Sequence, residues 1–130
     1  MLPWERSSRV RSVQPEITEI LASALRFLPE AVALTEAVSG MDQIRFANDA
    51  FEQLTGFAFG EIQGRDLSFL QGPETDSRIF ERLMRGSQAG AAETSPLELV
   101  LYRKDRSVFV DRVTLRMVVR GAGAFCVQVH

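Results

Sequence analysis

The sequence has little of the residue types that bind metal ions or form cross-links. It contains one cysteine, Cys126, and one histidine, His130. A single cysteine cannot form an intramolecular disulfide, and the two residues together cannot supply the Cys and His ligands of a structural zinc site. We therefore predict no metal site, and we expect Cys126 to be a small buried residue on the last strand.

The sequence also lacks an excess of basic residues and a long hydrophobic run. Its formal net charge is -2 and its pI is about 5.4, whereas nucleic-acid-binding domains usually carry a basic excess on one face. No uninterrupted apolar run reaches the roughly 18 residues needed to cross a bilayer, and the first residues do not resemble a signal peptide. We expect a cytoplasmic domain that binds neither nucleic acid nor membrane.

What is present is the composition of one globular domain. The chain has 130 residues, of which 45% are hydrophobic and 25% charged, and single cores commonly form at about 100–150 residues. Residues 1–14 are predicted to be a flexible tail. Pro15 suits the first position of a helix, and apolar residues follow it at helical spacing, which predicts a flanking helix over 15–28. Residues 29–130 form the domain proper.

Alternating apolar residues and turn residues predict an α+β domain. The predicted strands cover 31–35, 43–47, 97–103, 108–119 and 124–129. Asn48 and Asp49 are expected to cap a short helix that Gly56 ends, two single-turn helices are expected within 57–75, and Asp76 or Ser77 is expected to cap a longer helix. Because short turns join consecutive strands, we predict an antiparallel sheet with the helices on one face.

Several segments resemble the PAS family, and in particular its Light-Oxygen-Voltage (LOV) subclass. The PAS pattern is similar to residues 44–51, Ile-Arg-Phe-Ala-Asn-Asp-Ala-Phe, and to Thr55-Gly56-Phe57 after them. The LOV pattern is similar to residues 69–76, Phe-Leu-Gln-Gly-Pro-Glu-Thr-Asp, to residues 101–105 and to Val127-Gln128. The resemblance covers about residues 29–129. It implies a PAS fold, a five-stranded antiparallel sheet with short helices around a pocket, which holds a flavin in LOV domains.

The resemblance also implies which residues line the pocket. These cofactor-binding positions are Thr35, Asp66, Leu67, Gln71, Leu101, Asp111 and Gln128. In LOV domains, blue light joins the flavin to a cysteine four residues before the glutamine of the Phe-Leu-Gln motif, and this position is Leu67 here. A leucine has no thiol, so the photoactive cysteine is lacking.

The polar lining departs from the LOV pattern as well. Leu101 and Asp111 stand where LOV domains have asparagines, and Ser68 and Met84 stand where they have arginines that hold the flavin phosphate. Each unpaired flavin carbonyl costs about 1–3 kcal/mol, and lost charge-assisted contacts to the phosphate cost about as much. The cofactor is therefore unknown from the sequence, and these losses argue against FMN or FAD.

Three polar positions have two interpretations each. If Asp66 and Asp111 face the cavity, they favour a cationic or donor-rich ligand. Otherwise Asp66 caps a helical turn and Asp111 pairs with Arg65 or Arg112 at the rim, which we favour because a carboxylate buried without a partner is costly. Gln128 either reports the state of a ligand to the sheet surface or only completes a hydrogen bond of its strand.

The sequence thus predicts a sensory domain for signal transduction, the input module of a larger regulator whose effector follows this segment. We expect a homodimer through the helix at 15–28 and the open sheet face, and a pocket suited to a small-molecule ligand. The alternative is a cysteine-less LOV flavin photoreceptor that acts by photoreduction. No enzyme is expected, since His130 is terminal, Cys126 lies on a strand and the carboxylates show no paired spacing.

Overall fold

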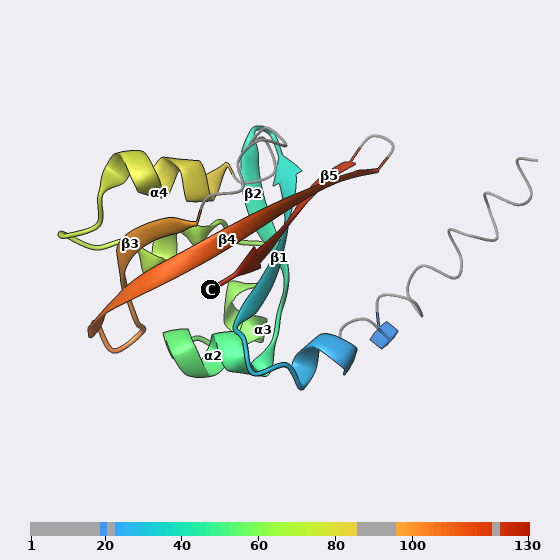
Figure 1. Ribbon diagram of the computed structural model, residues 1–130, viewed down its shortest axis with the longest axis horizontal. Helices are drawn as coiled ribbons and strands as arrows, with labels where there is room; N and C mark the ends of the chain where they lie inside the picture. The colour runs from blue at the N-terminus through green and yellow to red at the C-terminus, as the bar shows by residue number, and fades with distance from the viewer. Residues whose placement is uncertain (1–18, 21–22, 86–95, 121–122) are drawn as a thin grey trace, which may run out of the picture.

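The computed structural model describes residues 19–20, 23–85, 96–120 and 123–130, and its centre is one antiparallel sheet (Figure 1). Five strands lie in the order β2-β1-β5-β4-β3, and every neighbouring pair is antiparallel. The strands are β1 (Val32–Val38), β2 (Met41–Ala47), β3 (Leu97–Tyr102), β4 (Val108–Arg120) and β5 (Gly123–Val129). The predicted α+β PAS fold is confirmed.

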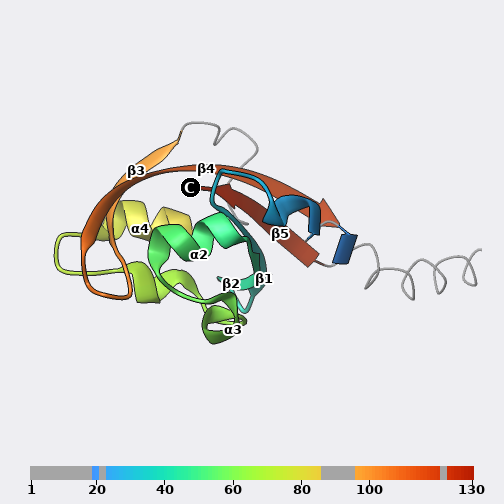
Figure 2. The ribbon, with the colours of Figure 1, turned by 90° about the horizontal axis from the view of Figure 1, so that it is seen from below.

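Short helices fill the space beneath the curved sheet (Figure 2). They are α2 (Asp49–Thr55), α3 (Phe59–Ile62), the 3-10 helix η1 (Leu67–Leu70) and α4 (Ser77–Met84). The predicted caps are confirmed: Asn48 accepts a hydrogen bond from the N–H of Phe51, and Asp76 accepts from the start of α4. Gly56 ends α2 in the left-handed conformation, at φ 78°, which a residue without Cβ adopts at little cost.

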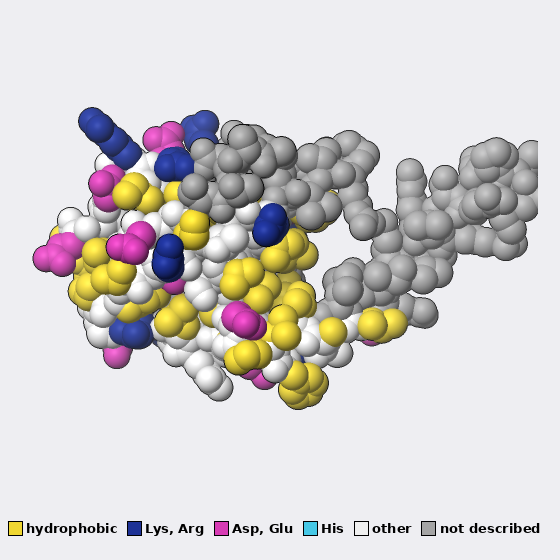
Figure 3. Space-filling view, viewed as in Figure 1, with side chains coloured by type: hydrophobic (Ala, Val, Ile, Leu, Met, Phe, Trp, Pro, Cys, Tyr) yellow, Lys and Arg dark blue, Asp and Glu magenta, His cyan; other side chains and the backbone are white. Residues whose placement is uncertain are grey.

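The two faces of the sheet differ in exposure. On β4, Phe109 and Val113 are buried against the helices, whereas Val108 and Val110 are exposed, the latter to 68%. This is the period-two alternation that the sequence predicted. Figure 3 looks onto the outer face and shows hydrophobic side chains gathered over the middle of the sheet, between scattered charged ones. The core is on the other face, and its fully buried side chains include Ile44, Phe51, Ile62, Leu67, Leu70, Leu83 and Leu101.

The first hairpin is tighter than the sequence predicted. The predicted strands end at 35 and resume at 43, but β1 extends to Val38 and β2 begins at Met41. Only Ser39 and Gly40 remain in the turn, at φ 53° and 84°. Two successive residues with positive φ match the right-handed twist of the flanking strands, and this geometry permits a two-residue connection.

The flanking segment is helical over part of its described residues, and the helix ends before Phe27 and Leu28. Residues 19–20 and 23–26 are helical. Residues 15–18 and 21–22 of the predicted helix, the tail at 1–14 and the loop after α4 lie outside the described residues. Ile20 and Phe27 are exposed to 67% and 84%. No helix within the described part of the chain is long and apolar enough to span a membrane.

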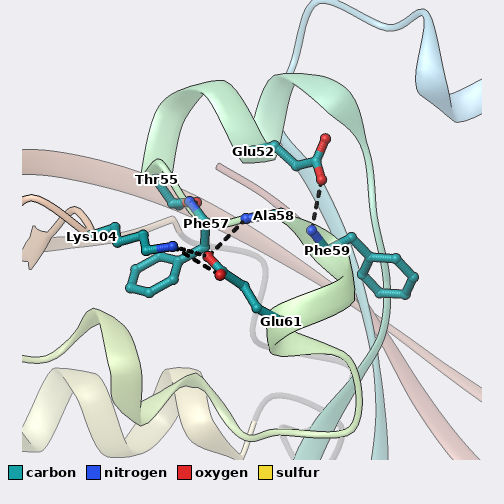
Figure 4. A network of polar contacts seen from close by, with 7 residues as sticks. All are labelled: Glu52, Thr55, Phe57, Ala58, Phe59, Glu61 and Lys104. Carbon is teal, nitrogen blue, oxygen red and sulfur yellow. Dashed lines mark hydrogen bonds and ion pairs between the residues drawn. The ribbon is translucent and has the colours of Figure 1, made fainter.

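A polar network fastens α2 and α3 to the hairpin between β3 and β4 (Figure 4). Lys104 donates from Nζ to both carboxylate oxygens of Glu61 at 2.9 Å, and its N–H donates to the carbonyl of Thr55. Glu52 accepts from the N–H of Phe59 at 2.6 Å. These contacts hold the short helices in place around the interior.

Candidate functional site

Three polar side chains meet in the interior of the domain: Asp111, Gln128 and His130. The imidazole of His130 lies between the other two, with Nδ1 2.6 Å from Asp111 Oδ2 and Nε2 3.0 Å from Gln128 Oε1. The side chains of His130 and Asp111 are 0% and 5% exposed, and Gln128 is fully buried. Figures 1 and 2 both place the end of the chain in the middle of the molecule.

The sheet brings these residues together from two neighbouring strands. β5 lies between β1 and β4, and Gln128 is opposite Ala33 on one side and Leu115 on the other. The N–H of His130 donates to the carbonyl of Ala31 at 2.8 Å, so the pairing with β1 continues past the end of β5. Because side chains alternate along a strand, His130 points to the same face as Gln128.

An aromatic ring closes one side of this cluster. Phe51 of α2 contacts the imidazole of His130 in an edge-to-face arrangement, with ring centroids 5.1 Å apart and an interplanar angle of 79°. Such edge-to-face pairs are favourable between aromatic rings. The imidazole is therefore held on several sides: by hydrogen bonds in its plane and by an aromatic contact from the helical layer.

One buried polar atom of the cluster has no partner. Among the described residues, Gln128 Nε2 is a buried side-chain nitrogen without a hydrogen bond. An unpaired buried donor costs about 1–3 kcal/mol, and the large majority of buried polar side-chain atoms in folded proteins have a partner. Gln128 thus has a donor available in the interior.

A second polar group lies on the neighbouring strands β1 and β2. The hydroxyl of Thr35 donates to Asp42 Oδ2 at 2.7 Å and lies 3.4 Å from the carbonyl oxygen of Cys126. Burial, with a further contribution from the charge of Asp42, raises the pKa of the Cys126 thiol to about 12. The thiol is therefore protonated at neutral pH and unreactive as a nucleophile, in agreement with its predicted role as a buried apolar residue.

The other predicted pocket positions have different surroundings. Leu67 and Leu101 are fully buried in the core, where neither offers a polar atom. Asp66 accepts from the N–H of Ser68 at 2.9 Å and caps η1, as its second interpretation stated. Gln71 is exposed and borders a cavity of about 220 Å³ beside α4, together with Met41, Ser77, Phe80, Glu81, Met84 and Arg85.

The predicted partner of Asp111 is wrong. Neither Arg65 nor Arg112 pairs with it; its partner is His130. Arg112 alternates to the exposed face of β4, and the guanidinium of Arg65 lies over the ring of Phe69, 5.4 Å from its centroid. Sequence reasoning set His130 aside because it is terminal, although its position two residues after Gln128 on a strand already indicated an inward side chain.

The cluster places an imidazole beside a carboxylate, but its surroundings do not resemble a catalytic centre. A nucleophile beside such a pair would indicate catalysis, yet the side chain that faces the ring from α2 is the hydrocarbon ring of Phe51. In the described part of the chain, no group of three or more His, Cys, Asp or Glu side chains is arranged to hold a metal ion.

Comparisons with known proteins show which family and which relatives the chain is similar to. The profile of the PAS domain family matches residues 29–128. Phototropin-2 of Oryza sativa subsp. japonica is 31% identical over 106 residues, which are 82% of this chain and 11% of that protein. A blue-light-activated histidine kinase of Brucella anthropi is 30% identical over 116 residues, 82% of this chain and 23% of that protein.

A solved structure is similar as well. A Light-Oxygen-Voltage domain that was studied with a flavin analogue is 30% identical and superimposes with a TM-score of 0.65, over 83% of this chain and 82% of that one. The chain spans less than a quarter of the phototropin and of the kinase, so it corresponds to one domain of those longer proteins.

Proposed function

The chain belongs to the PAS domain family and is a sensory domain of the kind found in signalling proteins, and from this premise we propose that it is the dimerising input module of a larger regulator. The blue-light-activated histidine kinase to which it is similar is much longer than this chain. We propose the same arrangement here, with residues 29–130 as the sensory domain, residues 15–28 as a flanking helix after a tail at 1–14, and an effector that follows.

The observation that carries the dimer proposal is the exposure of apolar side chains at two places. Val108 and Val110 project from the outer face of β4, and Phe27 projects from the flanking segment. Figure 3 shows that the outer face carries other hydrophobic side chains beside these strands. A second copy of the chain would cover this surface and remove its apolar area from water. The sheet face and the flanking segment are therefore proposed as the homodimer interface.

Sedimentation of the purified chain tests this proposal. We expect a mass of twice 14.5 kDa and dissociation when Val110 is replaced by glutamate, since a charge buried in an apolar interface is costly. Gln53→Glu is the matched control, because Gln53 is exposed on α2, away from the sheet. A monomeric wild-type chain at high concentration, or a Val110→Glu variant that stays dimeric, would overturn the proposal.

We further propose that the domain works without flavin adduct chemistry. Leu67 occupies the position that the LOV pattern gives to the reactive cysteine, and the thiol of Cys126 is buried on β5 with a raised pKa. The residues present do not fit a flavin: Leu101 offers no hydrogen bond, and His130 engages one carboxylate oxygen of Asp111 and the amide oxygen of Gln128. Asp111 and Gln128 are instead proposed as the positions that sense the state of the interior.

Absorption spectroscopy separates this proposal from the alternative of a photoreducible flavin photoreceptor. The alternative is favoured by the similarity to blue-light receptors, and it requires a yellow protein with structured absorption in the blue. We expect a colourless preparation that does not retain added FMN or FAD through gel filtration. Stoichiometric flavin in the purified chain would contradict the proposal and support the alternative.

A further inference from the structure

We propose that His130 occupies a binding site for a small monocyclic nitrogen heterocycle in the interior of the domain, so that a ligand binds only by displacing the histidine. The site is formed by Asp111, Gln128 and Phe51. The inference rests on the proposed sensory function and deepens it, because it names the class of ligand and the contact that binding breaks. It is carried by the enclosure of one side chain, by one unpaired nitrogen and by the backbone contacts of His130.

The imidazole of His130 is held in the way that proteins hold small ligands. Its side chain is 0% exposed. Its two ring nitrogens lie 2.6 Å from Asp111 Oδ2 and 3.0 Å from Gln128 Oε1, and the ring of Phe51 packs edge to face against it. Ligand sites commonly combine apolar walls with a few polar groups that fix the orientation of the ligand. Because the imidazole is fully enclosed, the ligand that replaces it is limited to a single ring.

The site contains one polar atom that the histidine does not use. Gln128 is fully buried, and its Nε2 has no hydrogen-bond partner among the described residues. The imidazole offers Gln128 one nitrogen, whereas a heterocycle with two neighbouring polar atoms on its edge can bind both atoms of the amide. The unused nitrogen therefore favours such a ring over the imidazole, and it is the feature that points to a ligand from outside the chain.

The backbone of His130 connects the site with the start of β1. Its N–H donates to the carbonyl of Ala31 at 2.8 Å. The next residue, Val32, donates its N–H to Asn48 Oδ1 at 2.9 Å, and Asn48 Nδ2 donates to the carbonyl of Leu25 in the flanking segment at 2.9 Å. The residue that fills the site therefore lies against the junction of the flanking segment and β1.

Competition for the site turns ligand binding into a conformational change. The imidazole and a ligand cannot occupy the same position, so a ligand binds only the state in which the ring of His130 has left. A ligand shifts an equilibrium toward the state for which it has the higher affinity. Withdrawal of the ring removes the side-chain contacts that hold the end of β5, and the hydrogen bond to Ala31 then opens more often. Ligand binding thereby loosens the junction with the flanking segment.

Imidazole added to a His130→Ala variant tests the site. The substitution leaves a space with the size and the polar partners of the missing ring, so imidazole should raise the melting temperature of the variant along a one-site saturation curve. The wild-type chain should show no such curve at the same concentrations. Leu83→Ala is the matched control, because Leu83 is also fully buried but leaves a space without these polar partners. In the His130→Ala background, the further change Asp111→Ala should weaken imidazole binding about tenfold or more.

Hydrogen exchange in the wild-type chain tests the competition. At an imidazole concentration ten times the Kd measured for His130→Ala, exchange at the N–H of His130 should accelerate about tenfold, because binding increases the population of the open state in proportion to ligand concentration over Kd. The internal control is the N–H of Gly64, which donates to the carbonyl of Ile44 on the edge strand β2 at 2.8 Å. Its exchange rate should not change.

Three outcomes would overturn the inference. The first is a His130→Ala variant that imidazole neither stabilises nor, if the variant is unfolded, restores to a folded NMR spectrum. The second is equal stabilisation of Leu83→Ala or of the wild-type chain, which would make the effect non-specific. The third is unchanged exchange at the N–H of His130, which would show that ligand and ring do not compete. Sedimentation and absorption test the proposed function independently, so its failure and the failure of this inference are distinguishable.

Discussion

Asn48 donates a hydrogen bond from Nδ2 to the backbone carbonyl of Leu25 at 2.9 Å, which ties the flanking segment to the buried core. The same nitrogen donates to the carbonyl of Glu30 at 2.9 Å. On its other side, Oδ1 accepts from the N–H groups of Val32 and Phe51. One side chain, 1% exposed, therefore joins the flanking segment, β1 and α2.

The substitution Asn48→Asp separates these two sets of contacts. An aspartate keeps an oxygen for Val32 and Phe51 but turns a second oxygen toward the carbonyls of Leu25 and Glu30. We expect a loss of about 2–4 kcal/mol in the free energy of unfolding, and faster hydrogen exchange at the amide of Leu28, which donates to Leu25. Denaturant titration and exchange measurements check this. An Asp variant with wild-type exchange at Leu28 would show that Asn48 does not hold the flanking segment.

A close approach in the loop before α4 supports a second prediction. A Cβ on Gly72 would lie 2.2 Å from two atoms of the Tyr102 ring. The loop is fixed there, because Glu74 donates its N–H to the Tyr102 hydroxyl and the hydroxyl of Thr75 donates to the carbonyl of Val100 at 2.7 Å. Gly72→Ala should therefore destabilise the domain by about 1–3 kcal/mol, the usual cost of overpacking, as measured by urea unfolding.

Gly60→Ala is the matched control for this substitution. Gly60 lies in α3, and a Cβ there would meet no atom within 4 Å. Alanine is favoured over glycine inside a helix by about 0.5–1 kcal/mol, so this variant should be neutral or slightly stabilised. Equal stability of the two variants would contradict the role assigned to the Gly72–Tyr102 contact.

The fold could be predicted from the sequence because its signals are local. The inward and outward sides of β4 follow from residues that alternate along one strand, and the helix ends follow from Asn48, Gly56 and Asp76, each of which acts within four residues of itself. The resemblance to LOV domains implied five antiparallel strands with short helices around a pocket, but the order of the strands was not predicted, because alternation along one strand does not specify its neighbours. The main departure, at Ser39 and Gly40, concerns the length of one turn.

The site could be predicted only in part, because its contacts cross between strands. Asp111 and His130 are 19 residues apart, and they meet because β5 pairs beside β4 with a particular register. The resemblance placed Asp111 and Gln128 among the pocket positions, but for Asp111 a position at the rim, paired with an arginine, was favoured, and the sequence could not show which side chain approaches it. A side chain two positions after Gln128 is expected to point to the same face of the sheet. Only the pairing of the strands shows that the ring of His130 reaches Asp111.

The single cysteine supports a third prediction. Burial raises the pKa of Cys126 to about 12, and thiol reagents react with the thiolate. The folded chain should give no reaction with Ellman's reagent at pH 8 over minutes, whereas the chain in guanidinium chloride should release one equivalent. Rapid stoichiometric reaction of the folded protein would contradict the burial of this thiol. Because the sequence contains one cysteine, the assay reports on Cys126 alone.

The ion pair of Glu61 and Lys104 supports a prediction about pH. The hydrogen bond from Lys104, followed by that from the N–H of Ala58, holds the pKa of Glu61 below its ordinary value of 4.5. A folded-state pKa below the unfolded one means that the pair stabilises the domain above about pH 4.5 and that this contribution is lost as pH falls through the lower value. Glu61→Gln should therefore lower the melting temperature slightly at pH 7 but not at about pH 3.

The variant Lys104→Met provides the control, because it removes the partner of Glu61 while leaving the carboxylate in place. In the Lys104→Met background, the further change of Glu61 to glutamine should have a smaller effect at pH 7, as expected for two residues whose energies are coupled. Both carboxylate and ammonium are solvent-exposed, so salt should reduce the wild-type difference as well. Equal effects of Glu61→Gln in both backgrounds would mean that the carboxylate acts through Ala58 alone and that the contact to Lys104 contributes nothing to stability.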